Sequence, residues 1–247
     1  LQLKLFIQSI EKNTDFKKIS VILRTSNKKI LEQYYSLIRT SEIVINYHIQ
    51  DSDLKSTLTQ YLQTCKATFL FLCVDDQVCL SPVTVEEIRE AGSHVDTLTL
   101  RFGANTRYSY NLGIKLDLAS CEPSYINNMI SWDAQNAHGD LAYVNSFDGT
   151  LLPRLKFERY SKYGIYIGPN SLEGIMNYGF QKFLKKKHIV GCMLNQKFVN
   201  IVFGQVQNET QNKSEHVHVD FLLKKFEMED FLSLTDIESK TAAISSP

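Results

Sequence analysis

The stretch Ala67-Thr-Phe-Leu-Phe-Leu-Cys-Val-Asp-Asp76 decides the fold of this chain. Its first eight residues form the most hydrophobic run in the sequence. Such a run predicts a strand that is buried on both faces, as in a parallel sheet covered by helices. The run ends at two adjacent carboxylates, Asp75 and Asp76, so we expect charged side chains at the carboxyl end of this strand.

The residues ahead of this run alternate between strand and helix patterns. Short β-branched runs at 19–24 and 43–49 predict strands, and 27–38 and 53–65 have helical spacing, with Asp53 as the N-cap of the second helix. This order is typical of one half of a doubly wound α/β sheet. Residues 1–12 predict a further helix, and a helix in that place normally follows a strand. We therefore expect the first strand of the sheet to be missing from this sequence.

The rest of the chain has a less regular pattern. It predicts helices at 83–91, 123–132 and from a capping box at 170–173 to about 186, and strands at 97–102, 142–146, 150–152 and 189–194. The Asp148-Gly149 pair predicts a tight turn. We find no internal repeat and no linker, so the sequence predicts a single domain over 1–247, with a frayed tail at 236–247.

The charge balance excludes several classes of function. Lys and Arg number 27, as do Asp and Glu, so the formal net charge is zero. Neither a nucleic-acid-binding protein nor a polybasic membrane-surface module is expected from that balance. The longest apolar run is too short to cross a bilayer. Five cysteines without a CxxC pair, and no recognisable signal peptide, predict a cytoplasmic protein with reduced thiols.

Asp75 and Asp76 are the strongest candidates for chemistry. Ligands of open α/β sheets bind at the carboxyl ends of strands. Two carboxylates there repel each other and need a compensating charge, which a divalent cation bridging to a diphosphate would supply. The alternative is that the pair simply ends a strand at a solvated loop. The sequence lacks GxGxxG, GxxxxGK[ST] and GxSxG, which disfavours dinucleotide-dependent dehydrogenases, P-loop NTPases and serine hydrolases.

A buried strand ending in Val74-Asp75-Asp76 after two βα units resembles the metal and nucleotide motif of GT-A-fold glycosyltransferases. Further segments follow in order: Arg101-Phe-Gly-Ala-Asn-Thr-Arg-Tyr-Ser-Tyr110, Trp132-Asp133, Asp140-Leu-Ala-Tyr143, Ser146-Phe-Asp-Gly149 and Pro169-Asn-Ser-Leu-Glu-Gly174. The ordered set resembles the majastridin-like bacterial group within this nucleotide-diphospho-sugar transferase superfamily, and the resemblance covers residues 5–231. The resemblance implies a GT-A-type, Rossmann-like open mixed sheet flanked by helices, with a nucleotide-binding half at 1–80 and an acceptor-side half at 81–235.

The resemblance also implies a function. It is that of a metal-dependent glycosyltransferase, which takes a sugar from a nucleoside diphosphate, most commonly UDP, and passes it to a glycan or small-molecule acceptor. Asp75 and Asp76 would hold Mn²⁺ or Mg²⁺ beside the nucleotide. Many members of the fold carry a third carboxylate where this chain has Gln77. That departure keeps a second hypothesis open, a GT-A-fold nucleotide-binding protein without transferase activity.

The remaining site candidates follow from position along the chain. An inverting enzyme needs a carboxylate base after the metal motif, and Asp140 and Asp148 rank nearly level for that role, ahead of Asp133. Asp148 has the alternative of being only a turn-former. The other candidates for nucleotide binding are Arg24, Ser26, Arg101 and Asn105, all of which could instead be ordinary surface residues. Trp132 and Tyr143 are candidates for the sugar or the acceptor, although a lone Trp is more often part of a core.

Overall fold

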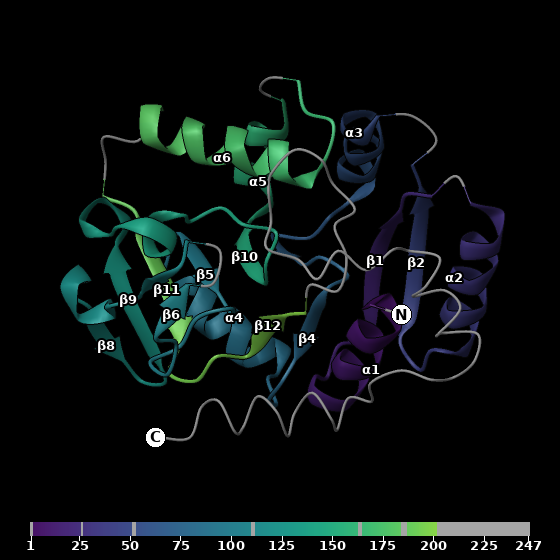
Figure 1. The fold of residues 1–247 in the computed structure, drawn as a ribbon. Coiled ribbons are helices and arrows are strands. Elements are labelled where there is room, and N and C mark those ends of the chain that lie inside the picture. The colour runs from purple at the N-terminus through teal and green to yellow at the C-terminus, as the bar shows by residue number, and fades with distance from the viewer. Residues whose placement is uncertain are drawn as a thin grey trace.

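Helices and strands alternate along the first 72 residues, as the sequence predicts (Figure 1). The computed structural model describes residues 2–25, 27–50, 53–109, 112–162, 165–183 and 187–201. Side-chain oxygens of Asn27 and Asp53 accept backbone N–H groups at the starts of α2 and α3, which satisfies donors that a helix leaves unpaired. The elements are α1 (Gln2–Asn13), β1 (Lys18–Leu23), α2 (Lys28–Thr40), β2 (Val44–Ile49), α3 (Leu54–Thr64) and β3 (Phe69–Leu72).

The later elements are mostly shorter. They are β4 (Gln77–Cys79), α4 (Val85–Ser93), β5 (Thr97–Thr99), β6 (Tyr108–Ser109), β7 (Ile114–Lys115), β8 (Ser124–Ile126), β9 (Met129–Asp133), β10 (Thr150–Pro153), α5 (Arg154–Lys162), α6 (Pro169–Phe183), β11 (Ile189–Met193) and β12 (Phe198–Asn200). Three single 3₁₀ turns lie at Leu118–Cys121, Ala134–Asn136 and Gly139–Ala142 among the described residues. No helix in the described part of the chain is both long enough and apolar enough to span a membrane.

The strands form a mixed sheet, as predicted. Its order is β3-β10-β5-β11-β9-β8, with β5 and β11 parallel and the other pairs antiparallel. Two predictions about this sheet are wrong. β3 lies at its edge and pairs antiparallel with β10, so most of β3 is half-buried rather than buried on both faces. β1 and β2 pair parallel with each other in a separate sheet, and do not join β3 in one continuous sheet.

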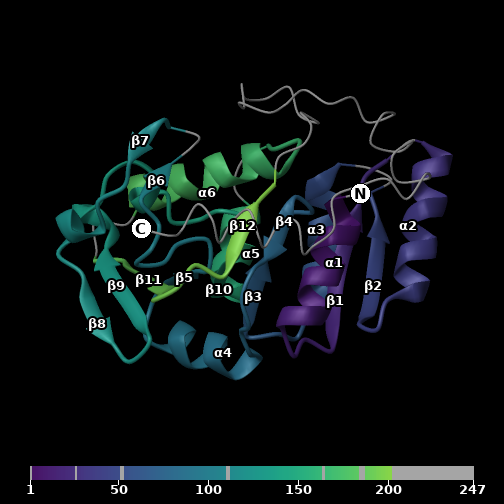
Figure 2. The same ribbon diagram turned by 60° about the horizontal axis from the view of Figure 1, so that its bottom comes forward.

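Helices cover both faces of the strands. The helices α1, α2 and α4 contribute to one apolar cluster, and α3, α5 and α6 to another. Leu151 faces the first cluster and Leu152 the second, because successive residues of a strand point to opposite faces. Figure 2 shows α4 and α6 on opposite sides of the six-stranded sheet. The result is a layered α/β/α arrangement.

Two local predictions are also wrong. The helix expected at 123–132 is the β8–β9 hairpin, in which Ile126 is paired with Met129 across a two-residue loop. Asn127 in that loop has a φ of 50°, a left-handed conformation that Asn tolerates better than most residues. The strand expected at 142–146 is a 3₁₀ turn followed by irregular chain. The predicted tail at 236–247 lies outside the described residues.

Candidate functional site

Asp75 and Asp76 lie just beyond β3, after Cys73 and Val74, in the turn that leads into β4. The Asp75 side chain is exposed, whereas Asp76 is half-buried and its Oδ1 is buried without a hydrogen-bond partner. The backbone nitrogen of Ile201, just after β12, donates to the Asp76 carbonyl oxygen at 2.6 Å and holds this turn in place. The predicted pair is therefore at the carboxyl end of β3, and Asp76 is the member that faces inward.

Asp76 belongs to a cluster of carboxylates. Burial, followed by the charges of Asp148 and Asp75, raises the pKa of Asp76 to about 7. Burial and the charge of Asp148 likewise raise the pKa of Glu173 to about 7. Desolvation by the surrounding atoms raises the pKa of Asp75 as well, although its side chain reaches solvent and that of Asp76 is half-buried. Groups with such shifts gather at functional sites.

A chain of amide side chains holds Asp148 in this cluster. Asn200 on β12 donates from Nδ2 to Asp148 Oδ1 at 2.9 Å, and Gln77 on β4 donates from Nε2 to Asn200 Oδ1 at 3.2 Å. Gln77 is fully buried, and its Oε1 accepts from the Val74 backbone nitrogen. Gln77 thus has a structural role, through Asn200, in the orientation of Asp148. The sequence does not identify Asn200 as a site residue, since it is a single polar residue in a short strand.

Glu173 is the site residue that the sequence analysis missed. It lies in the first turns of α6 and was interpreted as part of a capping box. Instead, its Oε1 accepts a hydrogen bond from the Phe147 backbone nitrogen and one from Ser146 Oγ at 3.3 Å. Its Oε2 accepts from the Tyr143 hydroxyl at 3.2 Å. Glu173 therefore fixes the loop that carries Asp148 against α6.

Arg101 and Asp140 lie beside the cluster. Arg101 is near enough to Glu173 to favour the ionised form of that carboxyl, and its Nη2 lies 3.4 Å from the Asp140 carbonyl oxygen. The Asp140 carboxylate accepts a short hydrogen bond from Ser109 Oγ. Tyr143 is bound to Glu173, and burial raises the pKa of its hydroxyl. The fold thus brings three predicted site residues close to the carboxylate cluster: Arg101, Asp140 and Tyr143.

Other predicted site residues lie elsewhere. Asp133 pairs with Ile189 at the start of β11, the opposite end of the sheet from Asp76, and its Oδ1 accepts from the backbones of Gln135 and His188. Trp132 is 2% exposed, and its indole donates to the Leu141 carbonyl oxygen at 3.0 Å. The predicted sugar-stacking role of Trp132 is therefore wrong, because its ring is part of the core.

Within the described residues, no contact brings the remaining nucleotide candidates to Asp76. Asn105 uses its Oδ1 to accept from the Gln196 backbone nitrogen at 3.0 Å, so it holds the loop before β12. Arg24 is exposed at the end of β1, and its Nη1 lies 3.4 Å from the Ile167 carbonyl oxygen. Ser26 lies outside the described residues.

The site has features that suit a divalent cation. Within the described residues no three His, Cys, Asp or Glu side chains are arranged to hold a metal by themselves. Mg²⁺ and its relatives, however, usually take one or two carboxylates together with phosphate oxygens and water. Asp76 offers an unpartnered buried oxygen next to other carboxylates, and within the described part of the chain no Lys or Arg forms an ion pair with it. Asp75 and Asp76 therefore fit a cation that a diphosphate also binds.

We compared the chain with known protein families, curated proteins and solved structures. No protein-family model matches this chain, and a search of curated proteins also found no match. TarS 1–349 from S. aureus is similar with a TM-score of 0.50 and 12% identity, over 80% of this chain and 55% of that one. HddC from Yersinia pseudotuberculosis is similar with a TM-score of 0.44 and 14% identity, over 81% of this chain and 79% of that one. HddC complexed with GMP-PN gives a TM-score of 0.43 at 13% identity, with the same coverage.

At these identities the similarity concerns the fold alone. The mixed sheet flanked by helices is a fold of the GT-A type, as the sequence predicts. This chain spans about half the length of TarS 1–349. Membership of the majastridin-like group stays a prediction.

Proposed function

We propose that this protein is a metal-dependent glycosyltransferase that moves a sugar from UDP to a glycan or small-molecule acceptor. The observation that carries the proposal is the buried, unpartnered Asp76 oxygen among further carboxylates at the carboxyl end of β3. Uncompensated carboxylates are costly to bring together unless a cation joins them. In open α/β sheets this end of the strands is where ligands bind.

Asp75 and Asp76 are the residues that would hold Mn²⁺ or Mg²⁺. The bound cation supplies charge neutralisation for the departing diphosphate. Asp76, being half-buried and fixed by the Ile201 backbone, is the better oriented of the two. Arg101 lies over the Phe102 ring with its guanidinium carbon 4.3 Å from the ring centroid, which limits its motion and suits it to meet a phosphate beside the cluster.

Asp148 is the base that the geometry favours. One of its carboxylate oxygens is held by Asn200, and its backbone nitrogen donates to Ser146 Oγ at 2.9 Å. Among the described residues no hydrogen bond reaches the other oxygen, which can take a proton from an acceptor hydroxyl. Glu173 acts through the loop backbone as a positioning residue for Asp148. Asp140 is the weaker candidate because its carboxylate accepts from Ser109 and is not among the charges that raise the pKa values of Asp76 and Glu173, as Asp148 is.

Turnover of UDP-sugars tests the proposal. We expect release of UDP from a panel of UDP-sugars to require Mn²⁺ or Mg²⁺, and to be lost in Asp76→Ala. The matched control is Asp133→Asn, which changes a carboxylate at the opposite end of the sheet and should keep wild-type turnover. Binding of UDP with Mn²⁺ but no hydrolysis and no transfer to any sugar acceptor would contradict the transferase and favour the alternative, a nucleotide-binding protein of the same fold.

A further inference from the structure

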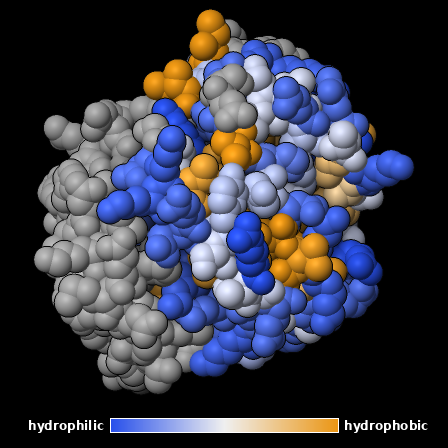
Figure 3. Space-filling model, turned by 90° about the vertical axis from the view of Figure 1, so that its right-hand side faces the viewer, coloured by the Kyte–Doolittle hydropathy of each residue, from blue (hydrophilic) through white to orange (hydrophobic). Residues whose placement is uncertain are grey.

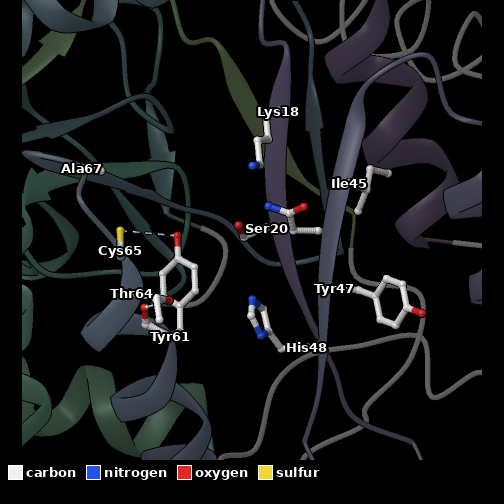
Figure 4. A pocket seen from close by; sticks show the side chains of 10 residues that line it. Lys18, Ser20, Ile45, Tyr47, His48, Tyr61, Thr64, Cys65 and Ala67 are labelled. Atoms are coloured by element: carbon white, nitrogen blue, oxygen red, sulfur yellow. Dashed lines mark hydrogen bonds between the residues drawn. The ribbon is translucent and has the colours of Figure 1, made fainter.

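Several lysines of this protein lie in open solvent. Figure 3 shows hydrophilic residues over much of the face that α2 and β2 form, and Lys28 and Lys29 at the start of α2 are exposed. Lys18 is exposed as well, and it lines a cavity of about 830 Å³ (Figure 4). Lys156 on α5 differs from these three, because it is only partly exposed and its amine is directed into a polar cluster.

Three acceptors surround the Lys156 amine. Its Nζ lies 3.1 Å from Thr97 Oγ1, 3.4 Å from the Asp96 carbonyl oxygen and 3.4 Å from His188 Nε2. Thr97 Oγ1 and His188 Nε2 are themselves 3.1 Å apart, and both side chains are buried. Burial lowers the pKa of His188 to about 4, so its ring is neutral at pH 7. The amine is therefore held in one place by neutral groups.

No carboxylate pairs directly with this amine. Among the described residues Lys156 forms no salt bridge, whereas the Lys162 amine on the same helix lies 3.0 Å from Glu158 Oε1. Burial lowers the pKa of Lys156 to about 8, and the charge of Asp96 opposes that shift only in part. Burial without a counter-ion disfavours the ammonium form. Lys156 therefore has more neutral, nucleophilic amine at pH 7 than an ordinary lysine, whose pKa is near 10.4.

The amine can be reached from solvent. Lys156 is partly exposed, and the neighbouring Asp96 side chain is 53% exposed. Lys156 follows the end of β10 at Pro153, which pairs with Phe69 at the start of β3, and so lies at the opposite end of the sheet from Asp76. A reagent reaches this amine without contact with the carboxylate cluster of the candidate site.

The surrounding charges favour one kind of product. The charge of Asp96 acts on both Lys156 and His188, and Asp133 acts on His188 as well. Tyr160, four residues further along α5, is a neutral titratable group that Asp96 also affects. These carboxylates repel a modification that adds negative charge, such as a carbamate, whereas an amide removes the positive charge of the amine and adds none. The cluster therefore favours acylation.

We propose that Lys156 is an acylation site of this protein, modified directly by an activated acyl group that a phosphate or a thiol carries. The neutral Nζ attacks the carbonyl carbon of the donor. A C–N bond forms as the bond from that carbon to the phosphate oxygen or the sulfur breaks, and the phosphate or thiolate leaves with the bonding electron pair. The proton lost from Nζ passes to water. This proposal is independent of the transferase function.

Acetyl phosphate and acetyl-coenzyme A are the two probes, each incubated with the full chain at pH 7.5. Digestion and mass spectrometry measure the acetylated fraction of each lysine over time. With at least one donor we expect Lys156 to react about fivefold or more faster than Lys18, Lys162 and a blocked lysine amide. The rate at Lys156 should level off above about pH 8, whereas that of the blocked amide should rise to about pH 10. The donor that reacts faster identifies the source of the acyl group.

Two matched variants separate the cluster from simple exposure. Asp96→Asn keeps an oxygen for the Ile189 backbone N–H but removes the charge that raises the pKa of Lys156, so acetylation at pH 7.5 should become about twofold faster. Glu158→Gln changes a carboxylate on the same helix that pairs with Lys162, and it should leave the rate at Lys156 unchanged. A urea unfolding curve for each variant shows that it is folded.

Three results would overturn the proposal. The first is acetylation of Lys156 that is no faster than that of Lys18 and Lys162 with either donor. The second is a rate at Lys156 that keeps rising to about pH 10, because the amine would then be an ordinary one. The third is slower acetylation in Asp96→Asn, which would mean that the carboxylate, and not burial among neutral acceptors, makes the amine reactive.

Discussion

At the scale of single residues, Asp76 carries the most information. A carboxyl group normally titrates near pH 4, and in this protein burial and neighbouring carboxylates raise the pKa of Asp76 to about 7. Between those two values the folded chain binds more protons at this residue than the unfolded chain does. The contribution of Asp76 to stability is therefore present at low pH and is lost as the pH rises from about 4 to 7.

The variant Asp76→Asn tests this linkage. Because Asn is never charged, the variant should raise the free energy of unfolding by about 1–2 kcal/mol at pH 8 and change it little at pH 4. Urea unfolding at both pH values, without divalent metal, measures the difference. A loss of stability of the same size at both pH values would show that Asp76 is a conventional structural carboxylate.

Asp148 and Asp140 are distinguished by their kinetics. Asp148→Asn keeps an oxygen for the hydrogen bond from Asn200 but loses the proton acceptor, so kcat for sugar transfer should fall by about 100-fold or more. Asp140→Asn should have a smaller effect, since its partner is Ser109 rather than the carboxylate cluster. A larger loss of kcat in Asp140→Asn than in Asp148→Asn would reverse the assignment of the base.

Part of the site could be predicted at this scale. Asp75, Asp76 and Asp148 stand out because each follows or precedes a strand pattern at a turn. Glu173 was misinterpreted because the spacing from Asn170 imitates a capping box. The structure starts α6 earlier, at Pro169, and Ser171 Oγ accepts from the backbones ahead of the helix. Proline favours the first position of a helix, and that signal could have corrected the helix start.

At the scale of elements, the helices with clear caps were the most predictable. Thr84 caps the start of α4: its hydroxyl accepts from the Glu87 backbone, while the Glu87 carboxylate accepts from the Thr84 backbone. This reciprocal pair satisfies two donors at the helix start. The β8–β9 hairpin was less predictable, because its apolar residues fit a short helix equally well and only the Asn127 conformation separates the two.

The cap of α4 has a measurable effect on stability. Thr84→Ala removes the side-chain acceptor and should lower the free energy of unfolding by about 1 kcal/mol. The control is Thr59→Ala, an exposed threonine in the middle of α3, which should change it by less than about 0.5 kcal/mol. Equal effects of the two substitutions on urea unfolding would mean that the capping box contributes nothing.

At the scale of the whole molecule, the alternation of elements predicted the class of fold but not the pairing of its strands. The hydrophobicity of residues 67–74 resembles that of a central strand, yet β3 lies at the edge of its sheet. The sequence also could not show that the site residues lie together, because they come from positions between 76 and 200. The elements β3, β10, α6 and β12 bring them into contact. Pairings over such distances leave no local pattern in one sequence.

The central claim is that Asp75 and Asp76 hold a cation together with a nucleoside diphosphate. Calorimetric titration of UDP, with and without Mn²⁺, tests this most directly on the wild type, Asp75→Ala, Asp76→Ala and the control Asp133→Asn. We expect Mn²⁺-dependent binding in the wild type and the control, and its loss in Asp75→Ala and Asp76→Ala, both of which stay folded. Unchanged UDP affinity in those two alanine variants, or binding that is indifferent to Mn²⁺, would contradict the claim.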